Sequence, residues 1–209
     1  MTLTYITKHL NSHDKCVKFL EKKRWDGIPT CPYCGCKKSS PKALRYTCLQ
    51  CKNSYSVTVG TVFQNSNLPL QKWLIGISIM MSAKKGVSGL QLARDLSVNK
   101  NTAWLLQMKI RAAMSKGEFQ YFQSEKRSVR VTLTGHFSRV RSTNEFQKND
   151  QYTPSNGCWS LLKRALIGQY HRIDEHYLYR YVDEISFKYE RRNQSDNGYA
   201  ELLRRILLL

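Results

Sequence analysis

Cys31-Pro-Tyr-Cys34 and Cys48-Leu-Gln-Cys51 are two cysteine pairs of the same spacing, separated by 13 residues. A pair of this kind places two thiolates in one tight turn, and zinc prefers four such ligands at tetrahedral corners. Gly35 follows the first pair and permits the backbone turn that this arrangement needs. A redox-active or incidental set of cysteines is the alternative. The spacing predicts a structural zinc ribbon whose metal ligands are Cys31, Cys34, Cys48 and Cys51.

The three other cysteines have different predicted roles. Cys36 is expected to point away from the metal, because Cys34 already completes the first turn. Cys16 and Cys158 are interpreted as small core residues. A ribbon of this size cannot fold on apolar burial alone, so the zinc ion is expected to supply its folding energy.

Basic residues are in excess, and they concentrate in the first half of the chain. The formal net charge is +19. Residues 1–116 hold 19 lysines and arginines against four acidic residues, a net charge of +15. This excess indicates a polyanionic partner, most often nucleic acid. A basic protein that is merely soluble, or one that binds anionic lipid, is the alternative.

Membrane and export signals are not evident in the sequence. The longest apolar stretch, WLIGISIMMSA at residues 73–83, is too short to span a bilayer. The first residues lack the apolar run of a signal peptide, and cysteines in such a context favour metal binding or free thiols over disulfides. We therefore expect a cytoplasmic protein without a membrane partner.

Helical spacing predicts one helix before the ribbon and three after it. Ser12 is expected to cap a helix over about residues 13–24, and Ser88 to cap one over residues 89–96. The other two are a mostly buried helix at residues 70–83 and a longer helix at about residues 100–114. YSVTVGTVF, at residues 55–63, has the composition of a strand.

Residues 88–114 predict a helix-turn-helix, in which the small Ala93 lies where the two helices cross. A recognition helix needs polar side chains at its start to reach base edges in the major groove. These are expected to be Lys100, Asn101 and Thr102. Contacts with the DNA backbone are expected from Gln107, Lys109 and Arg111. An ordinary helical hairpin is the alternative.

In the second half of the chain the helical periodicity is first lost and then returns. Residues 117–151 lack a long periodic pattern and are interpreted as a linker or disordered remnant. Helical spacing returns from residue 152, where Asp174 and Asp196 are expected to cap two helices. The chain is predicted to divide into four parts. These are the first helix and ribbon (1–66), the helix-turn-helix (67–116), the linker or disordered remnant (117–151) and the C-terminal helices (152–209). The predicted fold class is mainly α with a small β zinc ribbon.

Three stretches resemble one protein family. They are RWDGIPTCPYCG at residues 24–35, RYTCLQCKNSYSVTVGTVFQNSNLPLQKWL at residues 45–74, and CWSLLKRALIGQYHRIDEHYLYRYVDEISFKYERR at residues 158–192. Their order resembles bacterial insertion-sequence transposases that carry an N-terminal zinc ribbon, of the ISXO-like type. The resemblance implies a ribonuclease-H-like catalytic core in which two Asp and a third residue hold two Mg²⁺ ions for phosphodiester transfer.

Within this resemblance the third catalytic residue is Asn156, and Lys163 is a DNA contact. The two Asp cannot be identified. The segment that should carry them has shrunk to about residues 117–155, and its acidic residues are Glu118, Glu125, Glu145 and Asp150. A sheet of about five strands cannot be built from so few residues. The catalytic domain is therefore expected to be a truncated remnant of C-terminal helices, left by an internal deletion.

Asp183 and Glu184 are adjacent acidic residues near the C-terminus that could be taken for a carboxylate pair. Adjacent residues on a helix point about 100° apart, so the two carboxylates are not expected to face one site. We interpret them as solvated or structural.

The sequence thus predicts a transposase-family protein that binds the terminal repeats of an insertion sequence as double-stranded DNA and has lost catalysis. Zinc is the expected structural cofactor, and Mg²⁺ is expected only if the protein is active. A second copy or a full-length sister transposase is a candidate partner. The alternatives are an active transposase, which takes part in DNA transposition and recombination, and a zinc-ribbon module for transcription or RNA binding.

Overall fold

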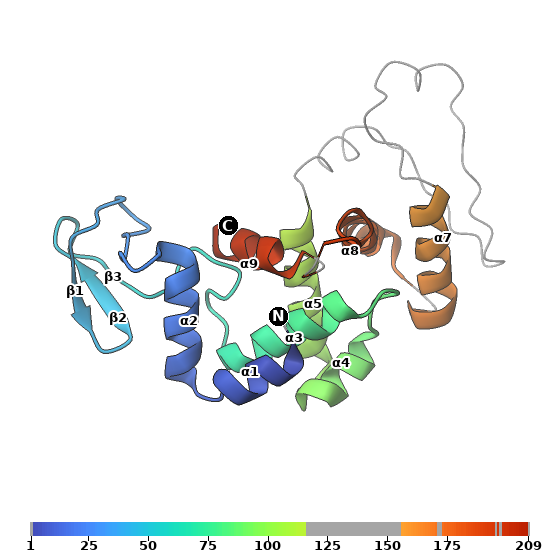
Figure 1. Ribbon diagram of the computed structural model, residues 1–209, viewed down its shortest axis with the longest axis horizontal. Coiled ribbons are helices and arrows are strands. Elements are labelled where there is room, and N and C mark those ends of the chain that lie inside the picture. The colour runs from blue at the N-terminus through green and yellow to red at the C-terminus, as the bar shows by residue number, and fades with distance from the viewer. Residues whose placement is uncertain (1, 116–155, 171–172, 195, 197, 209) are drawn as a thin grey trace, which may run out of the picture.

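The computed structural model describes residues 2–115, 156–170, 173–194, 196 and 198–208. Its elements in the first half are helices α1 (Leu3–His9) and α2 (His13–Trp25), strands β1 (Ser39–Lys42), β2 (Arg45–Cys48) and β3 (Ser54–Tyr55), and helices α3 (Leu70–Ser82), α4 (Gly89–Leu96) and α5 (Lys100–Met114). In the second half they are α7 (Asn156–Ala165), the π-helix η1 (Leu166–Tyr170), the 3-10 turn η2 (Glu175–Tyr177), α8 (Leu178–Glu190) and α9 (Tyr199–Leu208). The protein is mainly helical, with a small sheet at one end (Figure 1).

The sheet is a three-stranded antiparallel ribbon in the order β1-β2-β3. Ser39 lies opposite Cys48, and Lys42 lies opposite Arg45, so the β1–β2 turn is at the end of the hairpin away from the cysteines. Within the described ranges all strands belong to this ribbon. The predicted fold class, helices with a small β zinc ribbon, is confirmed.

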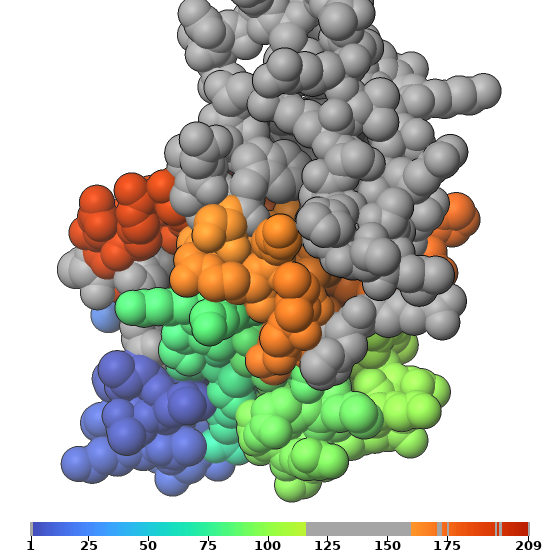
Figure 2. All heavy atoms as spheres, turned by 90° about the vertical axis from the view of Figure 1, so that its right-hand side faces the viewer, coloured from blue at the N-terminus to red at the C-terminus, as the bar shows by residue number. Residues whose placement is uncertain are grey.

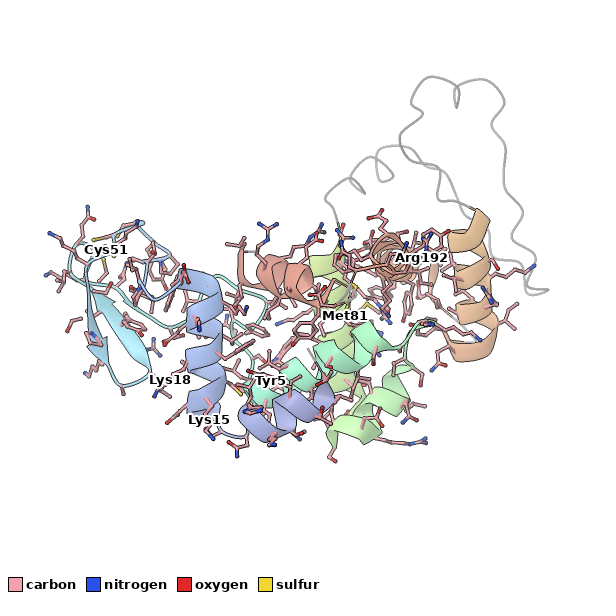
Figure 3. The ribbon with its side chains drawn as sticks, viewed as in Figure 1. Tyr5, Lys15, Lys18, Cys51, Met81 and Arg192 are labelled. Atoms are coloured by element: carbon pink, nitrogen blue, oxygen red, sulfur yellow. The ribbon has the colours of Figure 1, made fainter. Side chains whose placement is uncertain are left out.

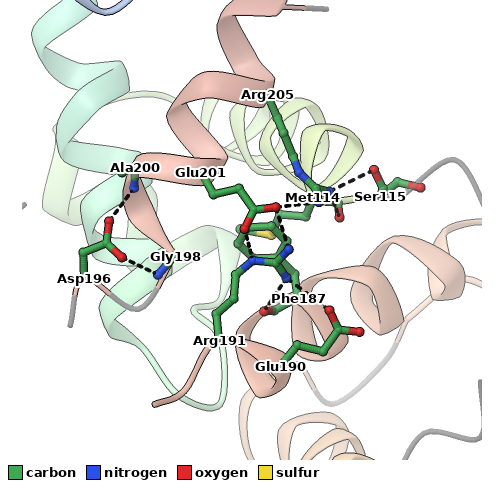
Figure 4. Close-up of polar contacts among 10 residues, drawn as sticks. All are labelled: Met114, Ser115, Phe187, Glu190, Arg191, Asp196, Gly198, Ala200, Glu201 and Arg205. Carbon is green, nitrogen blue, oxygen red and sulfur yellow. Dashed lines mark hydrogen bonds and ion pairs between the residues drawn. The ribbon is translucent and has the colours of Figure 1, made fainter. Parts of the chain in front are cut away.

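Side-chain caps start several helices where the sequence predicts them. Ser12 Oγ accepts from Lys15 N, and Ser88 Oγ accepts from Gln91 N at 3.2 Å. Asp196 accepts from the backbone N–H groups of Gly198 and Ala200, at 3.0 and 2.8 Å (Figure 4). Such caps satisfy amide groups that have no partner inside the helix. Helix α1 was not among the helices predicted from the sequence.

The predicted strand over residues 55–63 was wrong beyond Tyr55. The chain instead forms turns, in which Thr61 N donates to Thr58 O and Gln64 N to Thr61 O. Val57 and Phe63 turn their side chains into the core, where 1% and 2% of their surface is exposed. Strand composition therefore reflected apolar burial rather than strand pairing.

The main hydrophobic core draws on both ends of the chain. It joins Ile6, Leu20 and Ile110 from the first half to Leu203 and Ile206 from α9. Helix α9 contacts α2, α3 and α5, and α8 contacts α5. The apolar stripes of the C-terminal helices are thus covered by the first half of the chain, and the division expected at residue 152 separates segments that share one core.

Polar contacts fix α9 at the end of α5 (Figure 4). Arg191 donates to both carboxylate oxygens of Glu201, at 2.5 and 2.6 Å, and Arg205 donates to Glu201 at 2.7 Å. Arg205 also donates to the carbonyl oxygens of Met114 and Ser115. These bonds tie α8, α9 and the last turn of α5 together.

A smaller cluster places α7 on α8, through Leu162, Ala165 and Ile185. The following π-helix reaches the turn between α3 and α4, and a Cβ added at Gly86 would clash with the Tyr170 hydroxyl. In Figure 2 the orange segment, which includes α7 and η1, lies against the green segment that includes α3 and α4. Position 86 therefore needs glycine for two reasons. Its φ of +83° disfavours residues with a side chain, and the Tyr170 hydroxyl leaves no room for a Cβ atom.

Candidate functional site

Four cysteine side chains converge at the end of the ribbon. The Sγ atoms of Cys31, Cys34, Cys48 and Cys51 all lie within 4.8 Å of one another. Cys31 and Cys51 are 3.6 Å apart, and Cys34 and Cys48 are 3.5 Å apart. Zn–S bonds of about 2.3 Å at tetrahedral corners separate the sulfurs by about 3.8 Å, whereas a disulfide bond is about 2.0 Å long. The four thiols therefore fit a metal ion, and an all-sulfur set of this geometry is consistent with zinc.

Two equivalent turns hold these cysteines. Gly35 N donates to Cys31 O at 2.9 Å, and Lys52 N donates to Cys48 O at 3.1 Å. Gly35 and Lys52 both have left-handed backbones, with φ +70° and +60°. The backbone N–H groups of Cys51 and Gln50 lower the pKa of the Cys48 thiol to about 6. At Cys48 this favours the thiolate that a metal requires, whereas burial and the neighbouring thiols raise the pKa of Cys34 to about 12.

Cys36 lies outside the four-cysteine group in the described part of the chain. Its sulfur accepts from Lys38 N at 3.3 Å. Lys52 follows the second pair as Gly35 follows the first, and its left-handed backbone in that turn was not predicted from the sequence.

Arg24 and Trp25 join the ribbon to the end of α2. Arg24 donates to the carbonyl oxygens of Val57 and Val59, at 2.7 Å each. Trp25 meets Tyr55 edge to face, with ring centroids 5.8 Å apart. The metal centre is therefore attached to the helical part by a packed junction that sequence reasoning did not find.

Helices α4 and α5 form a compact pair joined by residues 97–99. Ser97 adopts a left-handed backbone, with φ +50°, and Asn99 Oδ1 accepts from Asn101 N at 2.9 Å. Ala93 is buried between the helices. Lys100 and Asn101 are exposed at the start of α5. The first turn of α5 is thus capped and accessible.

The other expected DNA contacts divide between the two faces of α5. Thr102 is half-buried, and Lys109 is exposed with its ammonium 5.9 Å from the Trp73 ring centroid. Gln107 and Arg111 are buried, so contacts of these two side chains with the DNA backbone do not fit this structure. Gln107 Nε2 donates to Val87 O at 2.9 Å, and Arg111 is held by Glu184.

A buried charge cluster connects α5 to α8. Arg111 Nε donates to Glu184 Oε2 at 2.7 Å, and Lys188 Nζ donates to Glu184 Oε1 at 2.5 Å. The Arg111 guanidinium also lies 3.9 Å from the Tyr181 ring centroid. Burial alone would raise the pKa of Glu184, but Lys188 and Arg111 outweigh it and hold the value at about 2. Glu184 is thus an ionised structural carboxylate.

The Asp183–Glu184 pair is buried, so its interpretation as solvated was wrong and the structural one fits. Burial raises the pKa of Asp183 to about 7. Its Oδ2 has no hydrogen-bond partner among the described residues. Both oxygens of Glu184 already hold cations, so the two carboxylates do not share a metal.

Helix α7 carries both residues that the resemblance singles out, the expected catalytic Asn156 and the expected DNA contact Lys163. Asn156 is its first residue, and Lys163 is exposed on its surface. The side chain of Asn156 and the acids Glu118, Glu125, Glu145 and Asp150 lie outside the described residues. The segment expected to be a linker, residues 117–151, lies there as well.

Comparison with known proteins finds a transposase domain within the chain. Residues 114–190 match the family model of the ISXO2-like transposase domain. No curated protein and no solved structure matches the chain. Within the described ranges no helix is long and apolar enough to span a bilayer. The matched domain contains α7 and α8, which pack on each other, and α8 also packs on α5. Over residues 114–190, therefore, the chain is similar to the transposase domain of ISXO2-like insertion sequences.

Proposed function

We propose that this protein binds the terminal repeats of an insertion sequence as double-stranded DNA, and that it no longer catalyses strand transfer. The observation that carries the proposal is the capped and exposed start of α5, with Lys100 and Asn101 in solvent. An asparagine amide can pair with an adenine edge, and a lysine can bind guanine or phosphate. The α4–α5 pair then acts as a helix-turn-helix, with α5 in the major groove.

The charge of the first half supports a DNA partner. Residues 1–116 carry a net charge of +15 and contain both the ribbon and the α4–α5 pair. Counterion release from phosphates makes such binding tight and steeply dependent on salt. Zinc in the four-cysteine site serves folding, because it joins the two turns of a ribbon that has little core of its own.

Loss of catalysis follows from the acidic residues that remain. Two-metal phosphodiester transfer needs carboxylates that bridge or flank both ions. The segment 117–155 offers a single Asp, Asp150. The buried pair on α8 is unsuitable, because Glu184 is neutralised by Arg111 and Lys188. Mg²⁺ would therefore have no complete site, and a second copy or a full-length sister transposase would be the partner at the DNA end.

Asn101→Ala tests the recognition helix. We expect affinity for the terminal repeat to fall by about 1–3 kcal/mol, because one bidentate base contact is worth that much discrimination. Affinity for random duplex DNA should fall less. If Lys100 contacts a base, Lys100→Ala should also weaken binding to the terminal repeat more than binding to random duplex DNA. Fluorescence anisotropy with both duplexes at one salt concentration measures the two affinities.

Asn193→Ala is the matched control, since Asn193 is an exposed asparagine that follows α8. It should change neither affinity. Equal losses on repeat and random DNA in the Asn101 variant would mean that α5 only holds phosphate. Structured RNA that displaces the terminal repeat at lower concentration than random duplex DNA would favour the RNA-binding module instead.

A further inference from the structure

A groove separates α2 from the ribbon hairpin, away from the metal centre and from α5. Its volume is about 560 Å³. It is bounded by the first half of α2, the β1–β2 turn and residues 56–70. In Figure 3 the labelled Lys15 and Lys18 mark the end of α2 that borders it, while Cys51 marks the opposite end of the ribbon.

The groove combines an apolar floor with a polar rim. Leu44 and Leu68 form the floor, and each is half-buried, while Val17, Val57 and Phe63 lie nearly fully buried beneath them. His13, Arg45 and Asn67 are exposed at the rim. None of the described residues that line the groove is acidic. The floor suits the carbon face of a sugar, and the rim suits an anion.

Basic residues are also frequent on the elements that bound the groove. Helix α2 carries five basic residues against two acidic ones, and Lys15 and Lys18 are exposed on it. Lys42 lies opposite Arg45 in the hairpin. Arg45 Nε donates to Ser54 Oγ at 3.3 Å, and the side chain of Arg45 is exposed where it lines the groove.

We propose that this groove holds one sugar–phosphate strand of DNA, with Arg45 and His13 on phosphates and a deoxyribose on the apolar floor. The proposal rests on the DNA binding proposed above and adds a second, sequence-independent contact. Phosphate contacts fix the register of a protein on the duplex, while base contacts specify the site. In Figure 1 the β1–β2 turn, the start of α2 and α4 all lie toward the lower edge of the molecule. The ribbon would thereby position the duplex that α5 reads.

Arg45→Gln tests the groove on a random-sequence duplex. The measured quantity is the slope of log affinity against log salt concentration. Loss of one phosphate contact should make this slope shallower by about 0.9. Arg192→Gln is the matched control, because Arg192 is an exposed arginine after α8 and on another side of the molecule from the groove (Figure 3). It removes the same charge and should leave the slope unchanged.

Asn67→Trp is a second variant that fills the groove without changing charge. It should weaken binding to the same duplex at every salt concentration. As a folding control, each variant should hold as much zinc as the unmodified protein and melt at the same temperature. Identical slopes for Arg45→Gln and Arg192→Gln, or unchanged binding by Asn67→Trp, would overturn the groove proposal alone. Absence of DNA binding by the unmodified protein would overturn the proposed function as well.

Discussion

Cys48→Ser is expected to release the metal and unfold the ribbon. Cys48 is fully buried and lies 3.5 Å from Cys34, and a serine hydroxyl replaces its thiolate poorly as a zinc ligand. Structural zinc contributes about 10–16 kcal/mol to the folding of small zinc modules. The effect should therefore exceed that of an ordinary core substitution, for which about 2–5 kcal/mol is typical.

Metal analysis of the purified protein measures this result. We expect one zinc ion per chain in the unmodified protein and none in the Cys48 variant. Amide hydrogen exchange should show protection lost across residues 31–55, while the buried residues of α3 and α5 stay protected. Cys36→Ser is the control, because Cys36 lies outside the four-cysteine group. Retention of zinc by Cys48→Ser, or its loss from Cys36→Ser, would contradict the ligand assignment.

Glu184→Ala should destabilise the helical core by about 3–5 kcal/mol. The substitution leaves Arg111 buried, with 0% of its side chain exposed and its charge uncompensated. The free energy of unfolding from urea titration measures the loss. Glu190→Ala is the control, since Glu190 pairs with Arg191 at 3.2 Å in a position that is 32% exposed. A pair as exposed as this contributes about 0–1 kcal/mol.

A double variant separates the ion pair from simple packing. Arg111→Met with Glu184→Leu removes both charges and should recover much of the stability, because buried apolar replacements of ion pairs are often neutral. A double variant as unstable as Glu184→Ala would contradict this account. The pKa of Glu184 is about 2 in the folded chain and 4.5 ordinarily, so its contribution is complete above about pH 4.5 and is lost as the pH falls toward 2.

The Arg111–Glu184 pair makes α8, which belongs to the matched transposase domain, part of the framework that holds α5. Lys188 extends this framework, because it also donates to the carbonyl oxygen of Ala83 at 3.0 Å, between α3 and α4. The orientation of α5 therefore depends on residues from the far end of the chain.

Local signals in the sequence predicted the features that depend on neighbouring residues. The four ligands follow from cysteine spacing, and Ser12, Ser88 and Asp196 are caps that the first turn of each helix requires. These features need no knowledge of distant contacts.

Features that depend on distant partners were not predicted. Arg111 has the polarity of a DNA contact, and its partner Glu184 lies 73 residues away in the chain. The segment after Tyr55 has strand composition, but Arg24 binds the carbonyl oxygens of Val57 and Val59, which a neighbouring strand would otherwise use. In both cases tertiary contacts override the local pattern.

The most direct test of the central claim uses one labelled duplex that carries the terminal repeat and another with the repeat scrambled. Each is incubated with the unmodified protein and Mg²⁺ or Mn²⁺, and complex formation and strand length are measured on the same sample. We predict tighter binding to the repeat, with both strands intact. Equal affinity for the two duplexes would contradict terminal-repeat recognition. Strand nicking that Asn156→Ala abolishes would contradict the loss of catalysis.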